Sequence, residues 1–560
     1  MFRNISLIAI SGLLIYLTLM PLLMLLTASL QSDFLEEGSI WTLSNYVESL
    51  LSRYNMEIFL NSFVYALGTT ILALIVGVSL AWLCVRTNTP GKVFIFLTGL
   101  TPLVIPGLLH TISWIFLFSP DIGVVNSWFS SWLGFPPFNI YSFGGMVFAQ
   151  AMNVAPIPFL LSLAVFNSMD TTLEEAAIAS GASSGEALRK VTFRLALPGI
   201  VSAGILVFVE TVANFEVAQL IGVPARINVF VSEIYNALYG FPADYGSASS
   251  LSVIVFTLAL IGVFYSNRLT REGEKYATVT GKGFKPTQID LKMWKWLAIC
   301  YVGGISLLTV VLPLFILMWI SLLPSFQPVS WGAVSNFTWV NYQKIFVISG
   351  IVDSFINSLI VSTLSAVLAT AIALGVAYIT IKTKFPGRWV LDGLAFLPIA
   401  IPGFIMGVAV LLWYLIAPLP FDLYGTLAII IVAYVTLYLP YGMRFMASSI
   451  VQIKDELEEA AISSGASWVR TMWLIYRPLI FPSIMGCVLF VFMISFREIS
   501  ASIFLYTQKT QLLSISLYSL WGDGQFVVLS ALGVLMILFF ILIALCLLML
   551  LRRSPSVRIF

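Results

Sequence analysis

Five ionisable side chains lie inside long apolar stretches of the sequence, where a charge requires an explanation. They are Glu210, Glu216, Arg497, Glu498 and His110, the only histidine in the chain. A charge within a membrane-spanning helix costs roughly 2.5–3.5 kcal/mol on insertion scales, so such residues are rare unless they serve a function. Acidic side chains that face one pore would attract a cation, and the first interpretation is therefore a path for a positively charged substrate.

Two of the acids occupy matching places. Glu216 follows Pro198 and Glu498 follows Pro482 at nearly the same distance along the chain. Because a helix rises by about 1.5 Å per residue, the two carboxylates should lie at similar depths in the outer part of the membrane. We expect both to line a translocation path and to make transient contacts with a metal ion, without a metal site of high affinity.

A structural role is the alternative for each of these residues. Glu498 would then pair with Arg497 or with a neighbouring helix, and Glu216 would complete a buried polar contact. Glu210 lies nearer the middle of its apolar stretch and has no acid in register in the other half. His110 is either a ligand or gate in the path or, as is more common for a lone histidine, a packed or hydrogen-bonded side chain.

Proline and glycine interrupt two apolar stretches at matching places. Proline removes a helical hydrogen bond, and broken helices are tolerated in a membrane where they line a cavity or are buried in protein. These residues are candidate gate or hinge elements, with kinks that serve only packing as the alternative. They are Pro102, Pro106 and Gly107 in the first half and Pro398, Pro402 and Gly403 in the second.

Membrane helices must position these side chains. Of the 560 residues 59% are hydrophobic and 10% are charged, against roughly 25% charged in soluble domains. A hydrocarbon core of roughly 30 Å requires about 20 apolar residues per helix. We therefore predict an all-α polytopic membrane protein with twelve spans in two groups of six. They are predicted near 6–28, 59–85, 92–118, 143–167, 200–222 and 247–267, and near 294–322, 354–381, 389–416, 425–446, 482–505 and 526–551.

One polar segment occurs twice between these spans. Leu173–Ser183 reads LEEAAIASGAS and Leu457–Ser467 reads LEEAAISSGAS, so a single position differs. Glu and Ala favour a helix, the acids lie in its first turn, and the glycine permits a tight bend. We expect both copies to dock onto the same kind of surface. The alternative is an amphipathic surface helix that happens to be duplicated.

Glu-Ala-Ala, a glycine six residues after the Glu and a proline further on resemble the EAA loop of binding-protein-dependent ABC-importer permeases. The resemblance implies a type I importer fold and a cytoplasmic loop of two short helices joined at the glycine, which fits a groove on an ATPase subunit. It assigns coupling to Glu174, Glu175, Ala176, Ala177 and Gly181 in the first copy and to Glu458, Glu459, Ala460, Ala461 and Gly465 in the second.

The two halves repeat beyond this loop. Phe59–Ser62 matches Phe355–Ser358, and these two segments lie further apart in the chain than the two EAA loops do. We predict a first permease repeat at 1–267, a cytoplasmic linker at 268–293 and a second repeat at 294–560. The residues that the first repeat has in addition should lie in the outer loop around 119–142, where aromatic side chains would suit the membrane interface.

Basic residues orient the chain. With both termini in the cytoplasm, the outer loops hold only Arg53, Arg226, Lys344 and Lys509 of the 28 Lys and Arg residues. This distribution satisfies the positive-inside rule and places both EAA loops in the cytoplasm. Together with the resemblance to binding-protein-dependent permeases, this orientation implies a protein of the bacterial inner membrane.

The linker adds a second resemblance. Its segment Tyr276–Phe284 looks like the linker of fused permeases in the ferric-iron importer group. The pair Gly281 and Lys282 within it does not form a phosphate loop, because Gly283 stands where Ser or Thr is required. No ATPase site is therefore expected in this chain.

Together the resemblances imply the permease subunit of an ATP-driven importer, not an enzyme, with ferric iron as the expected substrate. Import of thiamine, an aminoalkylphosphonate or a polyamine by the same architecture stays open. A secondary transporter driven by an ion gradient would leave the doubled loop unexplained. The implied partners are a homodimer of a cytoplasmic ABC ATPase, a periplasmic substrate-binding protein and the lipid bilayer. ATP and Mg would be held by the ATPase, no cofactor by this chain, and nucleic-acid binding has no support.

Overall fold

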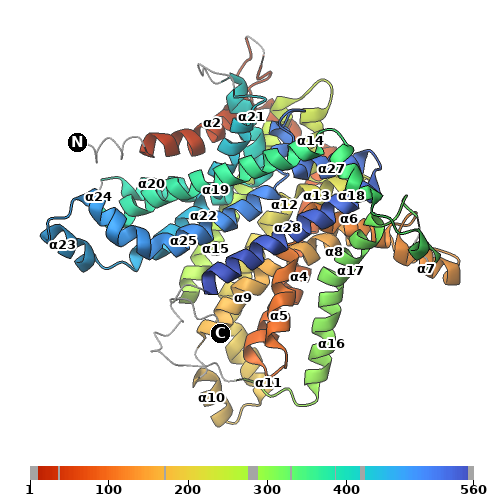
Figure 1. Ribbon diagram of the computed structural model, residues 1–560, viewed down its shortest axis with the longest axis horizontal. Coiled ribbons are helices and arrows are strands. Elements are labelled where there is room, and N and C mark those ends of the chain that lie inside the picture. The colour runs from red at the N-terminus through yellow and green to blue at the C-terminus, as the bar shows by residue number, and fades with distance from the viewer. Residues whose placement is uncertain are drawn as a thin grey trace.

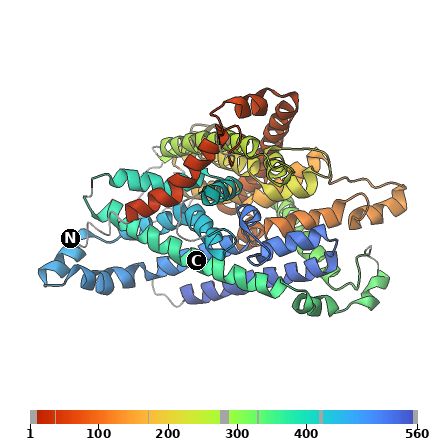
Figure 2. The same cartoon turned by 90° about the horizontal axis from the view of Figure 1, so that it is seen from above.

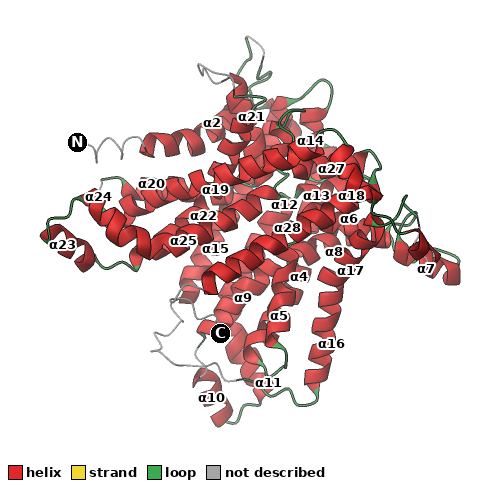
Figure 3. Ribbon diagram, viewed as in Figure 1, coloured by secondary structure: helices red, strands yellow, loops and turns green. Residues whose placement is uncertain are grey.

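The computed structural model describes residues 10–35, 38–169, 172–274, 288–327, 329, 331–384, 386–416 and 423–552. Within this part of the chain all regular structure is helical (Figure 3), apart from two isolated β-bridges. One bridge joins Gln31 to Trp41 and the other joins Thr87 to Ile289. The prediction of an all-α protein is thereby confirmed.

The first half of the described chain contains fourteen α-helices and four short π or 3-10 helices. They are η1 Ile15–Leu19, α2 Met20–Ser29, α3 Ser44–Leu51, α4 Arg53–Arg86, α5 Lys92–Leu100, η2 Thr101–Leu103, α6 Gly107–Phe118, α7 Val124–Leu133, α8 Phe143–Val154, α9 Pro156–Ser168, α10 Thr172–Ala179, α11 Ser184–Ala187, η3 Leu188–Thr192, α12 Phe193–Val212, α13 Phe215–Val217, η4 Ala218–Gly222, α14 Phe230–Tyr239 and α15 Tyr245–Glu274.

The second half continues the series. Its helices are α16 Trp294–Ser306, η5 Leu307–Val311, α17 Leu312–Ser321, η6 Trp331–Asn336, α18 Val340–Val347, α19 Ile351–Lys382, α20 Arg388–Phe396, η7 Leu397–Ala400, α21 Gly403–Ile416, α22 Leu427–Val451, α23 Asp455–Ser463, α24 Trp468–Thr471, η8 Met472–Tyr476, α25 Arg477–Phe496, α26 Ser502–Leu505, α27 Leu513–Gly522 and α28 Phe526–Arg552. Residues 275–287, the centre of the predicted linker with its segment Tyr276–Phe284, lie outside the described residues, and α15 extends into the linker range as far as Glu274.

Nine helices in the described residues are long and apolar enough to cross a membrane, and three bent helix pairs raise the total to twelve. The bends measure 99° between Lys92–Leu103 and Gly107–Phe118, 47° between Phe143–Val154 and Pro156–Ser168, and 112° between Arg388–Ala400 and Gly403–Ile416. The predicted number of spans agrees with this maximum. The third, fourth and ninth spans are however not single helices, because proline stands at each break.

The fifth and eleventh spans also differ from their predicted bounds. A helix runs from Gly185 to Val212, and another runs from Met472 to Phe496. Each helix begins before the predicted start and continues through an internal proline, and each ends sooner than predicted. Glu216 and Glu498 therefore lie just beyond the ends of these helices, not within them.

The two halves interlock through their first spans. Helix α2 packs against α15 of its own half and against α21 of the other half, while α17 packs against α28 of its own half and against α6 of the other. Small residues allow close approach within each half. A Cβ atom added at Gly77 on α4 would lie 2.7 Å from the Ala155 carbonyl oxygen, and one added at Gly442 on α22 would lie 2.8 Å from the Ala373 Cβ.

The molecule has two diverging arms (Figure 1). Helices α10 and α11 lie at the tip of the lower arm, and α23 and α24 lie at the tip of the left arm. The view from above also places α23 at an outer end of the molecule (Figure 2). The duplicated polar segments are therefore at separate tips, and α5 and α20, the first segments of two broken helices, run within the lower and left arms (Figure 1).

Candidate functional site

The break in the first half brings together Gly107 and Glu216. A Cβ atom added at Gly107 would lie 3.1 Å from Glu216 Oε1 and 3.0 Å from Asn153 Nδ2, so the carboxylate and an amide both rest on this glycine. Asn214 fixes the carboxylate in place, because its Nδ2 donates to Glu216 Oε2 at 2.6 Å while its Oδ1 caps α13 by accepting from the Val217 amide at 2.9 Å. The structure thus joins an acid and a glycine that the sequence suggested separately.

The break in the second half has the same arrangement. A Cβ atom added at Gly403 would lie 3.1 Å from Glu498 Oε1. That oxygen accepts from the Ala501 amide at 2.8 Å, and the backbone carbonyl of Glu498 accepts from the Tyr434 hydroxyl at 3.0 Å and from the Ser514 hydroxyl at 2.8 Å. In both halves a partly exposed carboxylate therefore rests against the glycine that begins the second segment of a bent helix.

Arg497 links the two halves at the same level. Its guanidinium donates to the carbonyl oxygen of Leu103 in η2, 394 residues away in the sequence. The break at Pro102 and Pro106 leaves helical carbonyl groups without intrahelical partners, and a charged donor satisfies one of them. The proposed pairing of Glu498 with Arg497 is not among the ion pairs of the described residues.

The remaining path candidates lie in different surroundings. His110 is fully buried and packs edge-on against Trp114, with ring centroids 5.8 Å apart. Glu210 is exposed on α12. No group of three or more His, Cys, Asp or Glu side chains suited to a metal ion occurs in the described residues.

A cavity of about 570 Å³ lies between the halves. Helix α15 contributes Asn267 and Thr270, while the second half contributes Asp392 on α20 and Arg444 on α22, along with η7. Because η7 belongs to the first segment of the bent helix, the cavity reaches the residues that precede Gly403. In Figure 1, α15 lies between the two arms.

The duplicated segments fold alike at their tips. Gly181 has φ of +95° and Gly465 has φ of +79°. After α10 the Ala182 amide donates to Ala177 at 3.0 Å, and after α23 the Ala466 amide donates to Ala461 at 3.0 Å. These bonds form the Schellman cap, in which a glycine adopts the left-handed conformation. We call 172–187 and 455–471 the first and second hairpins; both are two short helices joined at glycine, as the resemblance implied.

The first glutamate of each pair faces the protein. Glu174 is buried and accepts from the Arg86 guanidinium and the Thr192 hydroxyl. Glu458 accepts from the Tyr476 hydroxyl at 2.6 Å and from the Tyr378 hydroxyl at 3.3 Å. The second glutamates, Glu175 and Glu459, are exposed, as are Gly181 and Gly465. The exposed pair is accessible to a partner protein, whereas the first pair anchors each hairpin.

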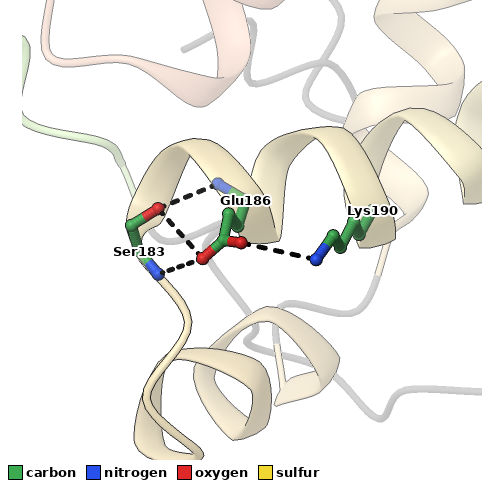
Figure 4. Close-up of polar contacts among 3 residues, drawn as sticks. All are labelled: Ser183, Glu186 and Lys190. Atoms are coloured by element: carbon green, nitrogen blue, oxygen red, sulfur yellow. Dashed lines mark hydrogen bonds and ion pairs between the residues drawn. The ribbon is translucent and has the colours of Figure 1, made fainter.

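A capping box begins the second helix of the first hairpin (Figure 4). The Ser183 hydroxyl accepts from the Glu186 amide at 3.3 Å, and the Glu186 carboxylate accepts from the Ser183 amide at 3.3 Å and from Lys190 Nζ at 3.3 Å. The second hairpin keeps only the serine half of this box, because Arg470 stands at the position of Glu186.

The fold and these two hairpins define a polytopic membrane protein built from two repeats, each with one exposed helical hairpin. The family model described as "Binding-protein-dependent transport system inner membrane component" matches residues 73–269 and 369–556. The chain belongs to this family, and both repeats carry its domain. It is an ABC-importer permease of the binding-protein-dependent type.

Curated relatives match most of the chain. The ferric transport system permease protein FbpB of Actinobacillus pleuropneumoniae is 28% identical over 88% of this chain and 69% of its own length. The putative ferric transport system permease protein FbpB 1 of Haemophilus influenzae is 29% identical over 82% of this chain and 71% of its own length. The Fe(3+)-transport system permease protein FbpB 2 of the same organism is 23% identical over 89% of this chain and 90% of its own length.

Proposed function

We propose that this chain is the complete membrane path of an ATP-driven importer of ferric iron. The observation that carries the proposal is the pair of nearly identical exposed hairpins, one on each repeat. Two equivalent hairpins on one chain supply the docking elements for two copies of an ABC ATPase, without a second permease chain. The names of the relatives support ferric iron as the substrate.

The acidic residues beside the two helix breaks, which we call the break acids, support a cationic substrate. Glu216 and Glu498 present carboxylate oxygens at two equivalent breaks, and oxygen ligands suit a hard cation. With a single carboxylate beside each break glycine, binding would be weak enough for release, which transport requires. A periplasmic binding protein would deliver the iron, and this chain would bind no resident cofactor. ATP and Mg would bind to the ATPase pair.

The diverging arms support a mechanism for coupling. The ATPase pair closes on ATP and draws the two hairpins together. This motion would close the cavity between the halves on the cytoplasmic side and open the path on the outer side. The rigid arms transmit this motion to the breaks at Gly107 and Gly403, where each helix changes direction. The hairpins and both termini then lie in the cytoplasm, and the repeats extend over 1–267 and 294–560 on either side of the linker.

Copurification tests the coupling assignment. The ATPase expressed from the same gene neighbourhood should remain bound to the tagged wild-type chain in detergent. The double variant Glu175→Gln/Glu459→Gln should lose it, because the exposed carboxylates of the hairpins are altered while the anchor glutamates are kept. Retention of the ATPase by the double variant, with full transport, would contradict the proposal.

Uptake of radiolabelled ferric iron tests the substrate. Cells that lack their own iron importer would express this chain with its binding protein and ATPase, and the double hairpin variant would serve as the control. Uptake that requires the hairpin glutamates supports ferric iron. An intact complex that hydrolyses ATP without iron uptake would contradict ferric iron, and thiamine, an aminoalkylphosphonate and a polyamine would be tested next.

A further inference from the structure

The two hairpins have nearly the same sequence but are anchored by different chemistry. Arg86 and Lys382 occupy matching positions at the ends of α4 and α19, in the same register that aligns Phe59 with Phe355. Arg86 binds Glu174, whereas Lys382 binds the Asp455 carboxylate at 2.5 Å and the Ile453 carbonyl oxygen at 2.6 Å. The equivalent basic residue thus holds the anchor glutamate in one half and a different partner in the other.

The Arg86–Glu174 pair is withdrawn from water. The side chain of Arg86 is 0% exposed and that of Glu174 is 10% exposed. Thr192 adds a hydroxyl donor to the same carboxylate. A buried charge that loses its partner is strongly unfavourable, because the remaining charge can neither regain its water shell nor find another counter-charge. The first anchor therefore requires the negative charge of Glu174.

The second anchor depends on hydroxyl groups. Glu458 accepts from Tyr476 and Tyr378, and neither donor is charged. Tyr476 occupies the place in the second repeat that Thr192 occupies in the first, in the register of the duplicated segments. An amide oxygen can accept a hydroxyl hydrogen bond as a carboxylate does, and an amide N–H can donate to the other phenol oxygen. The second anchor therefore tolerates a neutral side chain.

The chain between the repeats also reaches the first anchor. The Ile289 amide donates to the Arg86 carbonyl oxygen at 2.8 Å, and the Asn88 amide donates to the Ile289 carbonyl oxygen at 3.1 Å. The Asn88 side chain donates to the Asp290 carboxylate at 2.6 Å and accepts from the Leu291 amide at 3.0 Å. The described end of the linker is therefore bonded directly to the residue that holds the first hairpin.

We propose that Arg86 is a positioning residue for ATP coupling, and that the linker end at 288–291 reinforces it. The first hairpin is fixed to α4 by a buried charge pair and by the linker backbone. The second is fixed to α19 by the Lys382–Asp455 pair, in which the Asp455 side chain is 77% exposed and the attraction is screened by water, and its anchor glutamate is held by neutral donors. The two docking sites for the ATPase are consequently inequivalent, with the first one the more rigid. This inference rests on the proposed function, because it assumes that the hairpins receive the ATPase.

Matched substitutions of the two anchor glutamates show whether the anchors differ, as proposed, or have the same structural role. Glu174→Gln leaves Arg86 without a counter-charge and should lower substrate uptake per ATP hydrolysed by about tenfold or more. Glu458→Gln keeps its hydroxyl partners and should change the same ratio by less than about twofold. Both would be measured in proteoliposomes that contain the complete complex, with the amount of bound ATPase as a second readout. Equal losses in the two variants would overturn the proposal.

Two further variants keep the test informative if Glu174→Gln is poorly inserted. Arg86→Gln/Glu174→Gln removes both charges, and recovery of insertion and uptake above the Glu174→Gln level would support the pair. Asn88→Ala alters an exposed residue and should lower uptake per ATP by about twofold, with an unchanged melting temperature, because it removes two hydrogen bonds to the linker end. If the double variant shows no recovery, the charge pair between Arg86 and Glu174 does not position the first hairpin. If Asn88→Ala couples as the wild type does, the linker end does not reinforce Arg86.

The hairpin variant Glu175→Gln/Glu459→Gln distinguishes failure of this inference from failure of the proposed function. If that variant loses the ATPase while Glu174→Gln and Glu458→Gln behave alike, only the inequivalence of the anchors is wrong. If it keeps the ATPase and full transport, the hairpins do not receive the ATPase and the proposed function fails.

Discussion

Replacing both hairpin glycines by valine should uncouple ATP hydrolysis from transport. Gly181 and Gly465 have φ of +95° and +79°, and an added Cβ would meet no atom within 4 Å at either position. The cost is therefore confined to the backbone, at roughly 1–2 kcal/mol for each left-handed L-residue and more for a β-branched one. About 1.4 kcal/mol is a tenfold change in an equilibrium constant. The ratio of hairpins with the native bend to hairpins without it should therefore fall by a factor of roughly 5 to 30 at each site.

The assay compares uptake with ATP hydrolysis in the same proteoliposomes. Gly181→Val/Gly465→Val should insert normally and keep its melting temperature, since both glycines are exposed at the tips of the arms. Uptake per ATP should fall by at least the factor worked out for one hairpin. Gly185→Val is the matched control, because Gly185 has no positive φ, an added Cβ there meets nothing within 4 Å, and Val469 stands at the equivalent place in the second repeat. Wild-type coupling in the double variant would show that the glycine bends are not required for coupling.

Three further outcomes are expected. Glu216→Gln/Glu498→Gln should impair uptake of a cationic substrate without changing basal ATP hydrolysis, and unchanged uptake would assign both acids a structural role. Gly77→Ala should lower the melting temperature in detergent by about one to three degrees, because overpacking costs roughly 1–3 kcal/mol and the entropy of unfolding grows with chain length, whereas Gly303→Ala should not, since an added Cβ there meets nothing within 4 Å. Arg497→Met should cost roughly 1.5–3 kcal/mol of stability by removing a charged hydrogen bond between the halves, and an unchanged melting temperature would show that this bond does not stabilise the interface.

The fold could be predicted from the sequence because its determinants are local or repeated. Apolar runs of sufficient length indicated the twelve spans, and the duplicated segment indicated the two hairpins with their glycine bends. The predicted bounds failed for the fifth and eleventh spans, which were placed by apolar length alone. Pro198 and Pro482 lie inside helices, whereas the breaks occur later, near Asn214 and Arg497.

The contacts at the site could be predicted only in part. The break glycines and the break acids were recognised separately, but their contact joins residues that are far apart in the chain, as at Gly107 and Glu216. The bond from Arg497 to Leu103 spans 394 residues and leaves no local pattern. Arg86 was missed for a different reason. A basic residue at the same place in both repeats was visible in the sequence, but it also fits the ordinary charge at the inner end of a span.

ATP-driven accumulation of radiolabelled ferric iron in proteoliposomes tests whether this chain is the membrane path of an iron importer. The vesicles would contain this chain, its ATPase and its binding protein, with Glu175→Gln/Glu459→Gln as the paired preparation. We expect accumulation that requires both ATP and the hairpin glutamates. Accumulation that follows an ion gradient without ATP, or that persists in the paired preparation, would contradict it.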